Sequence, residues 1–124
     1  MVKLFILWLT IIIFLTVCTQ EYKLERMYYF ANKDYSRIAQ NPSKIEPTQI
    51  DQTIGKFEEI IKVNPDWGGI KNVRYTIAHL YFLKKDYKKA REKFTKIIQD
   101  FSYQIDICLQ ARFFIGLTFE NENK

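Results

Sequence analysis

The chain has 124 residues, of which 48% are hydrophobic and 16% aromatic, and it carries 19 basic and 14 acidic side chains. This length suits one domain, and the apolar content, free of low-complexity tracts, excludes a disordered chain. A formal net charge of +5 is too mild to indicate nucleic acid as a partner.

The first 17 residues differ in composition from everything that follows. Lys3 precedes the 14-residue uncharged run from Leu4 to Val17. As a helix this run would be about 21 Å long, which is short of the roughly 30 Å hydrocarbon core of a bilayer. We therefore predict a signal peptide over residues 1–17 rather than a spanning anchor, with an uncleaved signal anchor as the alternative.

The segment Leu15-Thr16-Val17-Cys18 resembles the lipobox of bacterial lipoproteins, in which the signal is cleaved before a lipid-carrying cysteine. Leu15 and Cys18 match, whereas Val17 is bulkier than the usual Gly or Ala. The resemblance implies a lipid on Cys18 and a lipidated tether over residues 18–22. Cys108 is the only other cysteine, so an internal disulfide is not expected.

Apolar residues at helical spacing predict five helices after the signal segment. The first runs from Glu21 to Gln40, and a loop with two prolines separates it from the second, at about Thr48 to Val63. Residues 64–69 then turn the chain, and Gly68-Gly69 predicts a flexible link. The stretch from Val73 to Ser102 contains two helices joined by a Lys-Lys-Asp-Tyr turn, and a fifth helix covers about Ile107 to Asn121.

The central pair of helices resembles the tetratricopeptide repeat (TPR). Short side chains at Ala78 and Ala90 allow two antiparallel helices to approach closely. The family pattern of large, small and aromatic residues is met at five positions of this hairpin: Ile77, Ala78, Tyr81, Ala90 and Phe94.

The pattern recurs upstream and downstream of the hairpin. Thr53 and Phe57 lie 37 positions before Ala90 and Phe94, and a set of three residues lies 38 positions after the start of the pattern: Ile115, Gly116 and Phe119. The resemblance implies an all-α solenoid of antiparallel helix hairpins over residues 23–124, with its last repeat incomplete.

The chain offers no constellation of residues typical of an enzyme. His79 is the only histidine, and its predicted helix carries no carboxylate between Ile70 and Lys85 that could complete a metal site. Gly68-Gly69 lacks the Gly and Lys-Ser/Thr that a phosphate-binding loop requires. We therefore predict a non-catalytic protein without a metal or another cofactor.

A partner-binding groove follows from the resemblance, because the first helix of each TPR hairpin lines the concave face. Six residues would line it here: Asn72, Tyr75, His79, Phe82, Gln110 and Phe113. Aromatic rings there offer apolar area with little entropy to lose on binding. In the alternative interpretation, Tyr75 and Phe82 only pack against the neighbouring helix.

Basic residues are densest around the central turn and the helix after it: Lys84, Lys85, Lys88, Lys89, Arg91, Lys93 and Lys96. A solvated helix face explains such a cluster, and attraction to anionic lipid head groups is the alternative. DNA or RNA is not expected as a partner of an exported chain.

Taken with the lipobox-like start, the repeats are similar to those of bacterial outer-membrane lipoproteins of the BamD type and the tol-pal cell-division coordinator type. That resemblance implies an envelope scaffold for protein or peptide partners, at the outer membrane facing the periplasm. The alternative is a structural module that self-associates, because the fifth helix carries apolar residues around much of its circumference.

Lipidation can be tested at Cys18. Cys18→Ala should leave the chain unprocessed or release it from the membrane fraction, because the cleavage site and the lipid-bearing thiol are both lost. Cell fractionation with size analysis measures this. A variant of mature size that still sediments with membranes would contradict lipidation.

Overall fold

A computed structural model describes all residues from Met1 to Lys124. The chain is all-helical, as predicted, and contains no strand. The order is α1 (Val2–Gln40), the short 3-10 helix η1 (Pro42–Lys44), α2 (Pro47–Val63), α3 (Ile70–Leu83), α4 (Tyr87–Asp100) and α5 (Ile105–Glu122). The predicted second to fifth helices agree with α2 to α5 to within a few residues.

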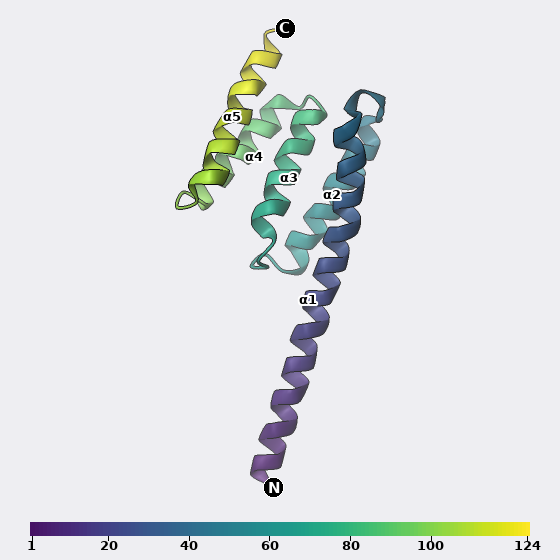
Figure 1. The fold of residues 1–124 in the computed structure, drawn as a ribbon, viewed down its shortest axis with the longest axis vertical. Helices are drawn as coiled ribbons and strands as arrows, with labels where there is room; N and C mark the ends of the chain where they lie inside the picture. The colour runs from purple at the N-terminus through teal and green to yellow at the C-terminus, as the bar shows by residue number, and fades with distance from the viewer.

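Successive helices run up and down and form two layers (Figure 1). Helices α1, α3 and α5 lie in the front layer of this view, and α2 and α4 lie behind them. Each helix packs on the next one along the chain, and α3 also contacts α1 and α5 within its own layer. Side chains on one face of α1, α3 and α5 are thereby brought to one side of the molecule.

Helix α1 is longer than the predicted first helix, because it is one unbroken helix of 39 residues that ends at Gln40 as predicted. The predicted signal segment and first helix are continuous, and residues 18–22, predicted as a tether, are helical. The reason is local: no proline or glycine lies between residues 2 and 40, so nothing breaks the helix where the hydropathy changes. Cleavage before Cys18 stays a prediction.

The N-terminal half of α1 extends away from the other helices (Figure 1). Helix α1 is the one helix that is long and apolar enough to cross a membrane, and none of its most apolar 18-residue window is buried within the protein. The C-terminal half, in contrast, belongs to the core. Leu24, Ala31 and Ile38, at seven-residue spacing, are all fully buried.

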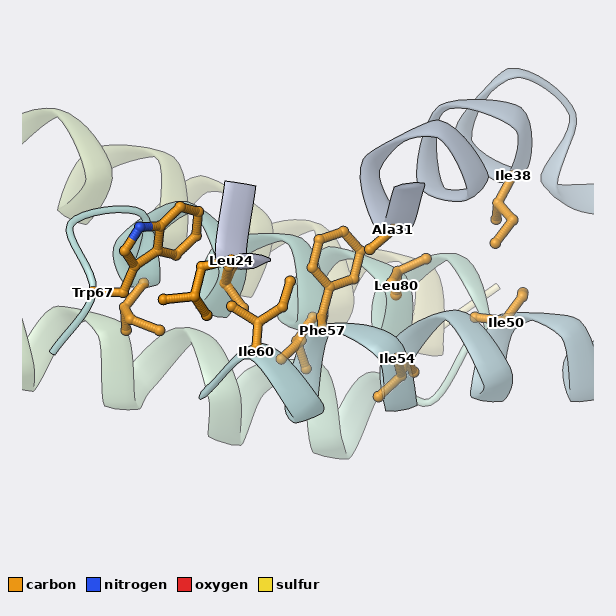
Figure 2. Packing of buried hydrophobic residues seen from close by; sticks show 12 residues of the cluster. Leu24, Ala31, Ile38, Ile50, Ile54, Phe57, Ile60, Trp67 and Leu80 are labelled. Carbon is orange, nitrogen blue, oxygen red and sulfur yellow. The ribbon is translucent and has the colours of Figure 1, made fainter. Parts of the chain in front are cut away.

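The larger core cluster joins α1, α2 and α3. The α1 stripe packs onto Phe57 and Ile60 of α2 and Leu80 of α3 (Figure 2). Complete burial of an aliphatic or aromatic side chain contributes about 1.5–3 kcal/mol. This packing therefore fixes the C-terminal half of α1 to the domain.

A second cluster joins α3, α4 and α5. Ala78 and Ala90 are both fully buried within it, and their short side chains let α3 and α4 lie close together. Phe94 and Ile97 of α4 fill the space beside them, and Ala111 of α5 closes the cluster. Small residues thus stand at the contacts between successive helices.

The α2–α3 connection is packed, whereas its two glycines had predicted a flexible link. Trp67 folds back into the core beside Leu24 (Figure 2), and its indole Nε1 donates a hydrogen bond to Glu21 Oε1 at 2.9 Å. A side chain on Gly69 would overlap the Trp67 ring, whereas a side chain on Gly68 would meet nothing. The absence of a side chain at Gly69 therefore leaves room for the indole ring. The backbone does not require glycine there, because its φ of −82° is available to any residue.

This difference between neighbouring glycines can be measured. Gly69→Ala should lower the free energy of unfolding by about 1–3 kcal/mol, because the indole or the loop must move. Gly68→Ala is the matched control and should stay within about 0.5 kcal/mol of the wild type. Urea unfolding of the full chain in detergent micelles, followed by circular dichroism, gives both values. Equal losses in the two variants would contradict this packing.

Candidate functional site

The candidate site is a half-buried aromatic surface across the layer of α1, α3 and α5. Tyr75, His79 and Phe82 lie at i, i+4 and i+7 of α3 and so share one helix face. Tyr35 of α1 flanks His79 on one side, and Phe114 of α5 flanks it on the other. We call these five residues the aromatic surface.

His79 lies at the centre of the aromatic surface. Its ring centroid is 4.8 Å from that of Phe114 and 5.8 Å from that of Tyr35, both in edge-on geometry. Along α3 it stacks on Phe82 at 6.0 Å and on Tyr75 at 6.5 Å. These distances and angles are those at which aromatic pairs attract, so the rings hold one another in place.

A hydrogen bond ties the aromatic surface together between α1 and α3. The Tyr35 hydroxyl lies 2.9 Å from His79 Nδ1. Either tautomer of a neutral imidazole can form this bond, because a phenol both donates and accepts. Burial lowers the pKa of His79 below its ordinary value, which favours the neutral ring.

The tyrosines of the aromatic surface are also uncharged at neutral pH. Burial raises the pKa of Tyr35, and neighbouring Tyr28 raises it further. Burial likewise raises the pKa of Tyr75, with a smaller contribution from Tyr35. The result is a neutral surface that can pack against apolar groups and exchange a few hydrogen bonds.

The side chains that commonly bind metal ions are scattered over the structure. No group of three His, Cys, Asp or Glu residues lies close enough together to hold a metal ion. The two free cysteines lie far apart in sequence, with Cys18 exposed on α1 and Cys108 buried in the second core cluster. The rings and the Tyr35–His79 hydrogen bond offer apolar contact and hydrogen bonding.

Four of the six residues predicted to line a groove are joined by ring contacts. Tyr75, His79 and Phe82 are half-buried, and Phe113 is 63% exposed with its ring 5.6 Å from that of Phe114. Asn72 and Gln110 are exposed and take no part in the ring contacts.

Tyr75 and Phe82 pack against the neighbouring helix, as the second alternative predicts, and their role in a groove stays a prediction. The Tyr75 ring packs edge-on against Phe94 at 5.7 Å, and the Phe82 ring lies 5.7 Å from that of Tyr87. Both side chains are nevertheless only partly buried, so each keeps one side open to a ligand.

Sequence reasoning missed Tyr35 and Phe114. Tyr35 lies 44 positions before His79, so the 37- to 38-residue period aligns it with residues 72 and 73 of α3 rather than with His79. Phe114 directly follows Phe113, which was predicted to line the groove, whereas Phe114 was not singled out from the apolar residues of the fifth helix. The available signal was the excess of aromatic residues on the first, third and fifth helices.

The residues predicted to pack between repeats differ in burial. Ile77 is buried like Ala78, Ala90 and Phe94, and Tyr81 is half-buried. In the third copy of the pattern Ile115 is half-buried, whereas Gly116 and Phe119 are exposed because no helix packs on that side of α5.

Two members of the basic cluster bind other helices rather than facing only solvent. Arg91 of α4 donates to both carboxylate oxygens of Glu122 on α5, at 2.6 and 3.0 Å. Lys84 binds Asp51 of α2 at 2.7 Å. Lys85, Lys88, Lys89, Lys93 and Lys96 are exposed, as expected for a solvated face.

Comparison with known proteins leaves this assignment to the geometry alone. No family model matches the chain, and neither a curated protein nor a solved structure matches it significantly.

The buried imidazole makes stability depend on pH. Because burial lowers the pKa of His79 below 6.5, the unfolded chain binds a proton more readily than the folded chain. The contribution of the neutral His79 ring to the free energy of unfolding is fully present above the pKa that His79 has in the unfolded chain. It is lost as the pH falls toward the lower pKa that His79 has in the folded chain. Unfolding free energies measured from about pH 7.5 to 5.5 should therefore decline with falling pH.

His79→Gln should flatten this decline, since the chain has no other histidine. Tyr35→Phe is the matched control, because it removes the hydrogen bond but keeps the buried imidazole and hence the decline. The same slope in wild type and His79→Gln would refute the assignment.

Proposed function

We propose that this protein is a non-catalytic scaffold that binds protein or peptide partners on the face of α1, α3 and α5. The observation that carries the proposal is the aromatic surface, a neutral set of rings from three helices that is held rigid yet left half open. Rigid aromatic rings lose little entropy on binding and commonly dominate protein interfaces.

We further propose that the architecture is a TPR-like solenoid of helix hairpins. Three features support it: the alternation of helices between two layers, the buried alanines where α3 meets α4, and the sequence period of 37 to 38 residues. In such an array the first helices of the hairpins face a common groove, which here would be lined by α1, α3 and α5.

The proposed location is the bacterial cell envelope, at the outer membrane facing the periplasm. The lipobox-like segment ending at Cys18 and the similarity to outer-membrane lipoprotein TPRs support it. The apolar half of α1 supports membrane attachment, either as a lipoprotein signal or as an uncleaved anchor. Both forms leave the helical domain tethered beside a membrane.

The chemistry of the face favours extended peptide segments with apolar side chains. The rings of Tyr75, Phe82 and Phe113 offer apolar area, and exposed Asn72 and Gln110 offer hydrogen bonds to a peptide backbone. No paired Lys and Asn of the kind that clamps a C-terminal carboxylate is present in the set, so that ligand is not proposed. Neither a cofactor nor nucleic acid forms part of the proposal.

Self-association is a second candidate function, and the exposed apolar side chains of α5 favour it. Leu109, Phe113 and Phe119 are large apolar residues of this helix that remain exposed. Monomeric proteins rarely expose such a patch without using it. A second copy of the chain could cover it and make the protein a structural module of the envelope.

Site-specific crosslinking in cells separates the two candidates. A photoreactive amino acid in place of Asn72 or Phe113 should give adducts with other proteins, because both positions lie on the proposed binding face. The same residue in place of Lys88 on α4 is the control and should give none, since Lys88 is exposed in the other layer.

The mass of the adduct decides between the candidates. A product at twice the 14.9 kDa of the chain identifies self-association, and other masses identify partners. The absence of adducts at both positions, or equal adducts at Lys88, would refute the scaffold proposal.

A further inference from the structure

We propose that one end of the domain rests on the bilayer surface, with Tyr103 and Ile105 inserted into the interfacial layer of the lipid. This end consists of the α2–α3 connection (residues 64–69) and the α4–α5 connection (residues 101–104), and we call it the membrane-facing end. The inference rests on the membrane attachment proposed above and adds an orientation and a lipid-binding surface to it.

The first step is the rigidity of α1. The apolar run from Leu4 to Val17 is followed by the uncharged residues 18–20, and the first charged residue after them is Glu21. Leu24, three residues later, is already fully buried in the core. The helix continues without a break through this point, so no flexible linker separates the apolar half of α1 from the domain.

The second step places the α2–α3 connection at the end of the uncharged run. Trp67 donates its indole hydrogen bond to Glu21 at 2.9 Å and packs into the core beside Leu24. If the uncharged run occupies the bilayer, Glu21 lies at the water boundary. The loop bonded to Glu21 must then lie there as well.

The third step brings in the α4–α5 connection. A cleft of about 560 Å³ lies between the two connections and is lined by residues of both, including Trp67 and Tyr103. Arg74 on its wall binds Asp100 at 2.6 Å and lies over the Phe101 ring at 5.8 Å. Both connections are therefore held at the same end of the domain, the end toward which the free half of α1 extends (Figure 1).

The chemistry of the exposed residues suits this position. Tyr103 is 75% exposed and Ile105 is 70% exposed, and neither belongs to a core cluster. Tyrosine is enriched at membrane–water interfaces because its ring is apolar and its hydroxyl is polar. Ile105, two residues after Tyr103, adds apolar side-chain area that would otherwise be exposed to water.

Charge does not provide the attraction at this end. Three basic residues (Lys71, Arg74 and Lys96) are balanced there by three acidic ones (Asp66, Asp100 and Asp106), so the local balance is not basic. The exposed lysines of the basic cluster begin at Lys85, in the turn at the opposite end of α3. In this orientation the α3–α4 turn points away from the bilayer. Its lysines therefore do not contact lipid head groups.

The inference holds for both forms of attachment. A lipid on Cys18 would sit three residues before Glu21 on the same helix, and Cys18 is exposed. The lipid and the spanning helix therefore bring the same end of the domain to the surface.

Fluorescence quenching in vesicles tests the orientation. The full chain, carrying Cys18→Ser and Cys108→Ala, is given single cysteines by Tyr103→Cys, Ile105→Cys, Ser43→Cys, Lys85→Cys or Phe5→Cys. Each is labelled with an environment-sensitive dye and reconstituted into phosphatidylcholine vesicles that contain a lipid with a nitroxide near its head group. Phosphatidylcholine alone and phosphatidylcholine with added phosphatidylglycerol are compared.

Labels at residues 103 and 105 should lose most of their fluorescence to the nitroxide in both lipids. Labels at residues 43 and 85, in the α1–α2 and α3–α4 connections, should lose little. Quenching equal at all four positions, or quenching at 103 and 105 only with the anionic lipid, would overturn the inference.

The label at residue 5 reports attachment by itself. If it enters the apolar environment while labels at 103 and 105 remain unquenched, the orientation is wrong and membrane attachment stands. If it stays in water and the protein does not float with the vesicles, the proposed attachment fails and the orientation fails with it.

Discussion

The packing of Leu24, Ala31 and Ile38 against α2 and α3 is the interaction on which the rest of this structure depends. It fixes to the core a helix whose other half has no protein neighbour. It also brings Tyr35 to His79 and Glu21 to Trp67. Loss of this stripe would therefore disconnect the apolar helix, open one edge of the aromatic surface and free the α2–α3 connection together.

The sequence predicts the helices well where an apolar stripe repeats, because helical periodicity directly reports which face is buried. A change of composition near Val17 predicts a signal boundary there, and α1 runs through that position without a break. Hydropathy reports the surroundings of a segment, whereas the helix continues until a residue such as Pro42 interferes with it. The sequence does not reveal the packing role of Gly69, because only the tertiary position of Trp67 shows why a side chain is excluded there.

The residues of the candidate site also fall into those that the sequence predicts and those that it does not. Tyr75, His79 and Phe82 can be found from the periodicity of one helix, since they share its face. Tyr35 and Phe114 cannot, because their approach to His79 depends on how far α1 and α5 slide along α3. The ion pair of Arg91 with Glu122 is equally invisible in the sequence, where Arg91 is one member of a run of basic residues.

The unbroken course of α1 also sets the direction in which the aromatic surface points among neighbouring molecules. An α-helix turns by about 100° and rises by about 1.5 Å with each residue. One residue added between Gln20 and Leu24 would rotate the whole domain by that angle around the axis of α1 relative to its apolar half. The direction of the aromatic surface around α1 is thus set by the spacing of residues within a single helix, and a rotation of the apolar half of α1 would also rotate the rings.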